Sequence, residues 1–461
     1  MRIWIAAAAA AVFALAAGAY SRLQPASTTG ILPTNPPTPY IHTYTTYDLG
    51  AQGDISRLRV LVVHGLDSSK DTMQLISEAL TDSGFDVFNI DLPGHGDSTV
   101  RFNAALARET LRAVVEQLKP GIVLGHSMGA GLLLDLAGDQ HFSTMVLLSP
   151  PPISVSEIQA DRVLLITGAY DIGRVRQFAA RTNDLGSPHI EWWNLRWAGH
   201  SSAIFNPVHV RRIVEWLGGD ATKVRTASRL IAIAAMLFCA VVFGVTALPG
   251  RKIEIRTMPL PLTIVRYIAA AGAAILILRF FVPLAWLRLF ATDYMISFLF
   301  LAGLILWIQL PRRPKLHFAN LVQATAAATF IIGIGLIAAA PILHMSLSDG
   351  RWWRFPFIAA ASLPLFLFDE TTIRRIHPLR LSNTMAVITR AVLWAGLITG
   401  VLLLNRDVAF LVLIAHLVVF FWIALWFGAY VVHRHTQDPF AAALFAALVQ
   451  GWCFAAWFVV R

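Results

Sequence analysis

The sequence predicts two halves of different fold class: an α/β domain with a mostly parallel sheet, followed by an all-α polytopic membrane domain. Two observations lead to this prediction. Hydrophobic residues make up 56% of the 461 residues and charged residues only 14%, a composition outside the soluble norm. The apolar excess lies almost entirely after about Leu230, whereas the stretch from Tyr40 to Asp220 reads as ordinary soluble sequence.

The N-terminal segment, residues 1–20, combines Arg2 with an alanine-rich apolar run and ends at Ala17-Gly18-Ala19. This pattern is typical of a signal peptide or an uncleaved anchor helix, and either one sends the following domain across a membrane. Residues 21–40 are rich in Pro, Ser and Thr, which predicts a linker. We therefore expect the soluble domain to occupy residues 41–220.

About eight apolar runs follow residue 220, and most approach the roughly 20 residues that a bilayer core demands. They are Leu230–Leu248, Leu260–Phe281, Tyr294–Leu310, Phe318–Leu343, Phe355–Phe368, Thr384–Leu404, Val408–Val432 and Phe440–Val460. The shortest, Phe355–Phe368, is the run whose length fits a full membrane crossing least well. Residues 221–461 are therefore expected to form a membrane domain with about eight helices.

Basic residues that flank these runs account for much of the formal charge of +10, which favours a topological role over nucleic-acid binding. With the soluble domain outside, the inner loops hold Arg251, Lys252, Arg256, Arg312, Arg313, Lys315, Arg374, Arg375, Arg380 and Arg434. The outer loops hold Arg288, Arg351, Arg354 and Arg406, and Lys223, Arg225 and Arg229 disagree with the pattern because they precede the first run on the outer side. We expect an integral protein of a bacterial inner membrane with residues 41–220 on the extracytoplasmic side.

Ionisable residues inside the apolar runs are open to two interpretations. Arg266, Arg279, Arg390 and His416 either line a transport path or lipid-headgroup site, or snorkel and pair with neighbouring helices. We favour the second. Both cysteines, Cys239 and Cys453, lie in apolar runs, so residues 41–220 can form no internal disulfide.

A candidate nucleophile lies in Gly125-His126-Ser127-Met128-Gly129, between an apolar run and a helix-like stretch. A serine exposed on a sharp strand-to-helix turn requires small residues two positions away on each side, because neighbouring backbones approach closely. The five-residue pattern alone is weak, since it also describes an ordinary turn serine. Its context strengthens it.

Further strands and loops surround this pattern. Arg59–Val63 leads into His64-Gly65-Leu66-Asp67, Val87–Ile90 leads into Asp91-Leu92-Pro93-Gly94-His95-Gly96-Asp97-Ser98, Val163–Thr167 leads into Gly168-Ala169-Tyr170-Asp171, and Ile190–Trp197 leads into Ala198-Gly199-His200-Ser201. A further strand is expected over Met145–Ser149. Each apolar run has the length and flanks of a buried strand.

In this order, the motifs resemble the oxyanion loop, the D-x-P-G-x-G-x-S loop, the nucleophile elbow, the acid loop and the histidine loop of the α/β-hydrolase superfamily. The resemblance covers roughly residues 55–217 and implies an α/β-hydrolase fold with serine hydrolase activity. Ser127 would be the nucleophile, His200 its general base and Asp171 the residue that orients the imidazole. The backbone amides of Leu66 and Met128 would hold the oxyanion.

Other residues are weaker candidates for these roles. His64, His95 and His126 stand inside motifs, where they are expected to shape loops, and His141, His189 and His209 lack a suitable loop. Asp161 precedes its strand, and Asp135 lies on the helix after the nucleophile. Neither position suits the acid of this fold.

Only Pro150–Asp161 separates the strand after the elbow from the strand before the acid loop, which predicts an open site without a sizeable lid. The loop His344–Arg354, with Trp352 and Trp353, is a candidate roof. The favoured function is a serine esterase or lipase for small-molecule or lipid esters, with membrane lipids as partners and no cofactor, metal or nucleic acid. Two alternatives stay open: an acyltransferase or peptidase using the same residues, and a transporter or membrane scaffold with an accessory hydrolase domain.

Overall fold

The computed structural model of the chain describes residues 1–44, 59–153, 158–184, 189–255, 259–281, 286–310, 314–348, 350–404, 411 and 415–461. The chain forms two compact units. The first, here called the sheet unit, comprises Ala14–Met236, Ala338–Ser348 and Val459–Arg461. The second, the helical unit, comprises Met1–Phe13, Leu237–Ile337 and Asp349–Phe458.

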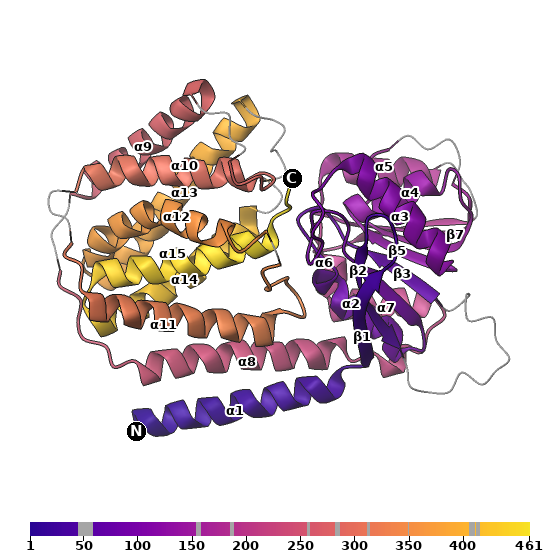
Figure 1. Ribbon diagram of the computed structural model, residues 1–461, viewed down its shortest axis with the longest axis horizontal. Helices are drawn as coiled ribbons and strands as arrows, with labels where there is room; N and C mark the ends of the chain where they lie inside the picture. Colours follow the sequence, from indigo (N-terminus) through magenta and orange to yellow (C-terminus); the bar gives the residue numbers. More distant parts are fainter. Residues whose placement is uncertain are drawn as a thin grey trace. The chain divides into compact units, whose positions relative to one another are not determined.

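The sheet unit contains a mixed eight-stranded sheet with the order β1-β2-β4-β3-β5-β6-β7-β8 (Figure 1). Its strands are β1 (Ala26–Leu32), β2 (Thr38–Tyr44), β3 (Arg59–Val63), β4 (Asp86–Ile90), β5 (Ile122–His126), β6 (Phe142–Leu148), β7 (Ala160–Gly168) and β8 (Ile190–Leu195). Strands β3 to β8 pair in parallel. Each strand expected from the sequence overlaps one of these six, which confirms the α/β-hydrolase fold class.

Strands β1 and β2 extend the sheet in antiparallel fashion. The composition of residues 21–40 predicts a linker, but the structure has β1 and the start of β2 within that range. The physical reason is that threonine and isoleucine favour strands. Most of the prolines that suggested a linker, such as Pro33 and Pro36, stand in the connection between the two strands, where a missing N–H removes no ladder bond.

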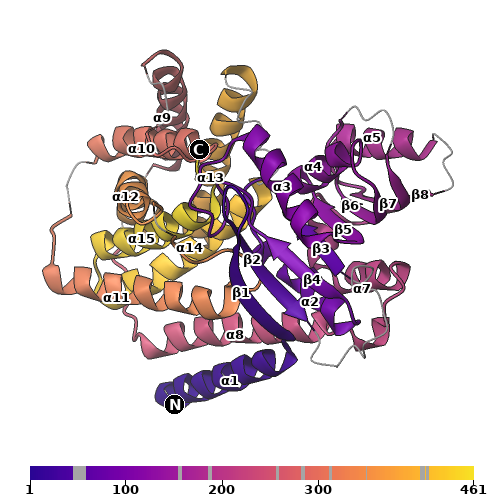
Figure 2. The same cartoon turned by 45° about the vertical axis from the view of Figure 1, so that its right-hand side comes forward.

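Helices cover both faces of the sheet (Figure 2). Alternate residues of β3 show why: Val60 and Val62 join one apolar core, and Leu61 and Val63 join the other. The first core also takes in α2 (Gln74–Asp82), α6 (Ser202–Phe205) and α7 (Pro207–Trp216). The second takes in α3 (Ala104–Leu118), α4 (Met128–Leu136) and α5 (Gly173–Asp184).

The connection between β6 and β7 is short, as the sequence predicts. Its described residues, 149–153 and 158–159, form no helix. The described part of this connection therefore contains no lid helix.

The remaining helices are long and apolar. They are α1 (Arg2–Leu23), α8 (Thr226–Ala247), α9 (Leu260–Phe281), α10 (Thr292–Ile308), α11 (Phe318–Ile334), α12 (Arg354–Thr371), α13 (Leu379–Leu404), α14 (Ala415–Thr436) and α15 (Pro439–Trp457). Among the described residues, eight helical segments are long and apolar enough to cross a membrane, and α10 is a shorter apolar helix. Residues 408–410 and 412–414 of the expected run Val408–Val432 lie outside the described residues.

The shortest expected run, Phe355–Phe368, belongs to a longer helix. The apolar segment around α12 spans Arg354–Arg375. Of an 18-residue apolar stretch within it, 67% is buried, against 22% of the corresponding stretch of α11. Helices α12 and α15 approach closely, since a Cβ at Gly451 would lie 2.8 Å from the Cβ of Ala359. Small residues permit this approach in membrane helices, and a helix surrounded by protein requires less hydrophobicity than one that faces lipid.

Ionic groups inside the helical unit form pairs. Arg390 donates a hydrogen bond to Asp369, and Arg374 binds Glu370 at 2.8 Å while His433 donates to the same carboxylate at 2.7 Å. Pairing between neighbouring helices, one of the two interpretations of Arg390, is what the structure shows. The side chain of His416 lies outside the described residues.

Candidate active site

The sharp turn at Ser127 forms where β5 ends and α4 begins. Ser127 has a φ of 49°, a conformation that is uncommon for a residue with a side chain and typical of strained functional turns. A Cβ at Gly125 would lie 2.7 Å from the backbone N of Ala130, and one at Gly129 would lie 2.5 Å from the carbonyl O of Val63. Only glycine fits at either position, which is the reason for the spacing seen in the sequence.

Three side chains expected to act together lie in hydrogen-bond contact. His200 Nε2 is 2.9 Å from Ser127 Oγ, and His200 Nδ1 is 2.8 Å from Asp171 Oδ1. A carboxylate can only accept, so Nδ1–H donates to Asp171, and the unprotonated Nε2 then accepts from the serine hydroxyl. The structure thus joins Ser127, His200 and Asp171 in the order that the sequence predicts.

The carboxylate of Asp171 is fully buried, with 0% of its side chain exposed. Burial alone would raise the pKa of Asp171, but the hydrogen bonds from His200 and from the N–H of Ile172 outweigh burial and hold that pKa below its ordinary value. The group is therefore ionised at neutral pH, and it can stabilise a positive charge on His200.

Two residues fix the backbone of His200. Ser149 Oγ donates to the carbonyl of His200 at 2.8 Å, and His126 Nε2 lies 3.1 Å from the same oxygen. Burial and the neighbouring His200 lower the pKa of His126 to about 3, so this ring is neutral and donates through Nε2–H. The sequence predicts His126 as a loop-shaping residue but gives no signal for Ser149, whose contact joins segments far apart in the chain.

The loop after β3 (the β3 loop, His64–Asp71) lies against the turn at Ser127. A Cβ at Gly65 would be 2.8 Å from His126 Nδ1 and 3.2 Å from Ser127 Cβ. Leu66 follows Gly65 directly, and Met128 is the first residue of α4, where backbone N–H groups have no intrahelical acceptor. Of the two backbone positions expected to hold an oxyanion, Met128 follows the serine directly and Leu66 follows the glycine that packs on it; their role stays a prediction.

A buried charged cluster ties the β3 loop to the loop after β4 (the β4 loop, Asp91–Phe102). Lys70 Nζ donates to Asp91 at 2.6 Å and to Asp97 at 2.5 Å, and the N–H of Lys70 donates to Asp91 at 2.8 Å. Burial would raise the pKa of Asp91, but Lys70 outweighs it and the pKa falls to about 2. His64 adds a third link, since it accepts from the N–H of Leu92 at 3.1 Å and donates to the carbonyl of Gly65.

The weaker acid candidates are engaged elsewhere. Asp161 lies 2.9 Å from His141 Nε2, and both side chains are exposed. Asp135 on α4 forms an ion pair with Arg108. Neither aspartate contacts His200 through a hydrogen bond, so the structure leaves Asp171 as the partner of that ring.

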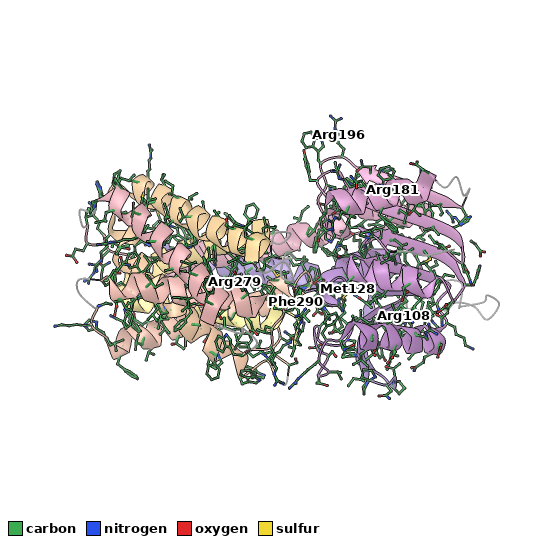
Figure 3. The ribbon with its side chains drawn as sticks, turned by 90° about the horizontal axis from the view of Figure 1, so that it is seen from above. Arg108, Met128, Arg181, Arg196, Arg279 and Phe290 are labelled. Atoms are coloured by element: carbon green, nitrogen blue, oxygen red, sulfur yellow. The ribbon has the colours of Figure 1, made fainter. Side chains whose placement is uncertain are left out.

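An exposed aromatic pair stands on the two loops that carry Asp171 and His200. Tyr170 is 66% exposed and Trp197 is 73% exposed, and their ring centroids are 6.1 Å apart. The N–H of Tyr170 donates to the carbonyl of Ala198 at 2.9 Å, which joins the two loops. Arg196 projects from its loop beside Trp197, while Met128 lies at the start of α4 (Figure 3).

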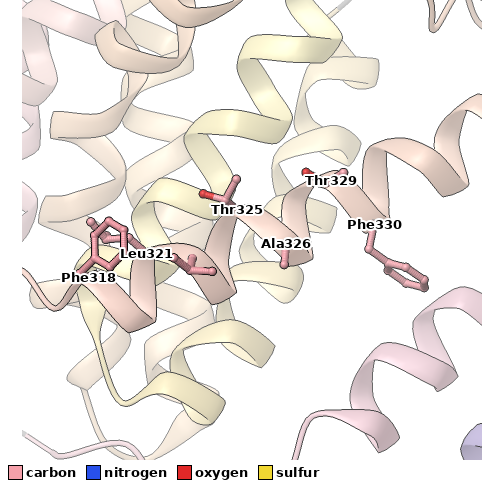
Figure 4. A pocket seen from close by; sticks show the side chains of 7 residues that line it. Phe318, Leu321, Thr325, Ala326, Thr329 and Phe330 are labelled. Atoms are coloured by element: carbon pink, nitrogen blue, oxygen red, sulfur yellow. The ribbon is translucent and has the colours of Figure 1, made fainter.

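Metal-binding groups and cavities are further features that could mark a site in the described residues. Within the described ranges, no group of three or more His, Cys, Asp or Glu residues could hold a metal ion. A hollow of about 660 Å³ belongs to the helical unit and is lined by α11 residues Phe318, Leu321, Val322, Thr325, Ala326, Thr329 and Phe330 (Figure 4). None of these lining side chains is titratable.

Comparison with known proteins gives one family and a set of similar structures. The model of the alpha/beta hydrolase family matches residues 60–302. An alpha-beta serine hydrolase homologue from Coxiella burnetii is 20% identical over 41% of this chain and 95% of its own, with a TM-score of 0.34. XC6422 from Xanthomonas campestris, an α/β serine hydrolase without lid, is 18% identical over 43% and 94%, with a TM-score of 0.35.

A third similar structure is the carboxylesterase CesB from Bacillus subtilis, which is 16% identical over 45% of this chain and 98% of its own, with a TM-score of 0.34. No curated protein matches the chain.

Proposed function

The chain belongs to the alpha/beta hydrolase family, and we propose that it is a membrane-bound serine hydrolase that cleaves esters of lipid-like or cell-envelope molecules through an acyl-enzyme. The observation that carries this proposal is the line of hydrogen bonds from Ser127 through His200 to Asp171. A serine hydroxyl is a poor nucleophile until a base takes its proton. His200 is within reach to do so.

The proposed reaction begins when Ser127 Oγ attacks the ester carbonyl carbon and its proton passes to His200 Nε2. The imidazolium that forms is stabilised by the ionised Asp171. His200 then gives the proton to the departing alkoxide, and the acyl group remains on Ser127. A water molecule, deprotonated by His200, then attacks the acyl ester on Ser127 and releases the carboxylic acid and the free serine.

The oxyanion that forms in each step requires donors that already point at its position. We assign the backbone N–H groups of Leu66 and Met128 to this task. Met128 is fixed by α4, whereas Leu66 is fixed only by the contacts of its loop. The placement of the β3 loop therefore determines how well the oxyanion is held.

The proposed substrate class rests on two features. The described part of the β6–β7 connection carries no lid helix, which supports the proposal of a substrate larger than a lid-covered pocket would admit. The exposed Tyr170 and Trp197 provide apolar rings with polar edges on the loops that carry Asp171 and His200, and such rings suit the boundary between lipid and water. An acyl chain lying on these rings would be recognised by its length.

We further propose that the apolar helices span a membrane, with the sheet unit on the extracytoplasmic side. Basic residues on the expected inner loops, such as Lys252, Lys315 and Arg434, support this orientation. Arg229, which disagrees with the pattern in the sequence, is fully buried between Glu78 and Asp82. Its charge is offset inside the sheet unit, which weakens the disagreement.

The proposal is tested by labelling the full chain, in detergent, with a fluorophosphonate probe. We expect labelling of the wild type and none of the Ser127→Ala variant, because the probe reacts only with an activated serine. Hydrolysis of p-nitrophenyl esters of graded chain length then tests the substrate class. Tyr170→Ala and Trp197→Ala should raise KM for long esters and leave butyrate hydrolysis unchanged. Equal labelling of wild type and Ser127→Ala would refute the proposal.

A further inference from the structure

Two short segments that are remote in sequence from the rest of the sheet unit nevertheless belong to it. Ala338–Ser348 lies between α11 and α12 along the chain, and Val459–Arg461 follows α15. Both segments contact the β3 loop and the β4 loop. The β3 loop carries the Leu66 N–H that we assign to the oxyanion, and the β4 loop is tied to it through Lys70.

The C-terminal segment forms a short backbone bridge between the two loops. The N–H of Val459 donates to Asp67 Oδ1 of the β3 loop at 2.8 Å. On the β4 loop, the N–H of Val460 donates to the carbonyl of Gly94 at 2.9 Å, and the N–H of Phe102 donates to the carbonyl of Val460 at 2.7 Å. The fit is close, since a Cβ at Gly94 would lie 2.7 Å from the Val460 oxygen.

His344 makes a second bridge between the same two loops. Its side chain is only 4% exposed, and Nδ1 lies 2.6 Å from Asp71 Oδ2 at the end of the β3 loop. On its other side, Nε2 lies 3.4 Å from Ser346 Oγ and 3.8 Å from Asp97 Oδ1 of the β4 loop, which is contact distance and longer than a hydrogen bond. Asp97 is also a partner of Lys70, so His344 packs beside the charged cluster that joins the loops.

These contacts bear on Leu66, whose N–H is assigned to the oxyanion. Leu66 stands between Gly65, which packs on the turn at Ser127, and Asp67, which is held by Val459. A turn outside regular structure has few hydrogen bonds of its own, so external partners decide where its N–H points. An oxyanion donor acts only when it lies about 2.7–3.1 Å from the developing charge.

We propose that Val459–Arg461 and His344 are positioning elements for the oxyanion hole, so that full hydrolase activity requires residues from beyond α8 as well as residues 14–236. This inference rests on the proposed function, because it assigns the Leu66 N–H to the oxyanion. Neither element touches the substrate. Each acts by holding the β3 loop against the β4 loop.

The test uses the full chain in detergent with p-nitrophenyl butyrate, a short ester that does not depend on lipid. Two variants are compared with the wild type: a chain that ends at Phe458, and His344→Ala. For each we expect kcat, per Ser127 titrated with a fluorophosphonate, to fall about tenfold to hundredfold, with KM within about twofold because ground-state binding is unaffected. Affinity for an alkylboronic acid, which forms a tetrahedral adduct on Ser127, should fall in parallel with kcat.

Two further variants make the comparison specific. His344→Asn keeps an N–H donor close to the position of Nδ1, so it should recover part of the lost kcat. His141→Ala removes the exposed pair with Asp161 in the same unit, and it should retain wild-type kcat. If the chain ending at Phe458 does not fold, the two His344 variants decide the question.

The outcomes separate this inference from the proposed function. Wild-type kcat in the truncated chain and in His344→Ala, with Ser127→Ala inactive, would overturn the positioning role and leave the hydrolase intact. A lower melting midpoint with unchanged kcat per titrated serine would also overturn it, because the segments would then be only structural. Full activity of Ser127→Ala would instead refute the proposed function.

Discussion

Gly65 leaves no room for a side chain between the β3 loop and the turn at Ser127. We predict that Gly65→Ala lowers kcat about 100-fold, because its Cβ would push the loop, and the Leu66 N–H with it, away from the serine. Kinetics on p-nitrophenyl butyrate would measure this change. Gly173→Ala is the matched control, since nothing lies within 4 Å of the Cβ position of Gly173. Similar losses in both variants would contradict the prediction.

Asp91 is the residue whose ionisation should be visible in stability. Its pKa is about 2 in the folded chain, below the ordinary 3.8, because Lys70 outweighs burial. The folded state therefore binds fewer protons than the unfolded state, and the stabilisation is present above pH 3.8 and lost as pH falls toward 2. We predict that Asp91→Asn is destabilised by about 3 kcal/mol at pH 7.

Melting midpoints of wild type and Asp91→Asn, followed from pH 7 down to pH 3, check this prediction. The difference between the two melting midpoints should become smaller below about pH 4. Protonation of Asp91 there removes from the wild type the ionic stabilisation that Asp91→Asn already lacks. A difference that stays constant over this range would assign the effect of the substitution to packing and not to charge.

For single residues, the sequence predicts those whose role is marked by a motif in the neighbouring sequence. Ser127, Asp171 and His200 each follow a strand and stand in a short motif of small residues, and the fold brings the ends of parallel strands to one edge. Ser149, His344 and Val459 could not be predicted, because their contacts join segments far apart in the chain. Nothing in the neighbouring sequence marks such contacts.

Among the structural elements, α2, α8 and the end of α1 are held together by Arg229. Its guanidinium binds Asp82 through Nη1 at 2.8 Å and Nη2 at 2.9 Å, lies 3.0 Å from Glu78, and donates to the carbonyl of Leu23. The side chain has 0% exposure. Both α1 and α8 are candidate spans, and this residue ties the end of the first and the start of the second to α2 within the sheet unit.

We predict that Arg229→Leu lowers the unfolding free energy by about 3–5 kcal/mol, because Glu78 and Asp82 would stay buried without their cation. Arg229→Lys should recover little, since an ammonium cannot bind bidentately. The exposed pair of Arg211 and Glu215 provides the control: Arg211→Ala should cost less than about 1 kcal/mol. Thermal melting in detergent measures all three, and equal losses in Arg229→Leu and Arg211→Ala would count against an anchoring role.

Elements were predicted well where composition and packing agree. The central strands β3, β5, β6 and β7 are apolar because both faces of a parallel sheet are covered, and such runs are visible in sequence. Strands β1 and β2 were not predicted, because their threonines and the prolines of the connection between them have the composition of a linker. The apolar run of α12 is shorter than the helix itself. The helix lies among other helices and carries the polar residues Asp369 and Glu370 near its end, so the apolar run stops before the helix ends.

For the whole molecule, the basic residues between the apolar helices bear on the expected membrane orientation. Of the basic residues expected on the outer loops, Arg229, Arg351 and Arg354 are buried. Arg351 donates to the carbonyls of Ala455 and Phe458 at the end of α15. Such arginines serve folding within their own unit. Arg374, on an expected inner loop, is buried in the same way, whereas Lys252 on another expected inner loop is exposed and fits the positive-inside rule.

We predict that the sheet unit is extracytoplasmic and that the α8–α9 connection is cytoplasmic. In a chain with Cys239 and Cys453 replaced by alanine, two single-cysteine variants test this: Glu116→Cys on α3 and Lys252→Cys after α8, both at exposed positions. In bacterial spheroplasts, a membrane-impermeant maleimide should label the first variant directly and the second only after the membrane is permeabilised. The reverse pattern would place Ser127 in the cytoplasm, where the enzyme would meet metabolites and inner-leaflet lipids, and the proposal of a cell-envelope substrate would have to be abandoned.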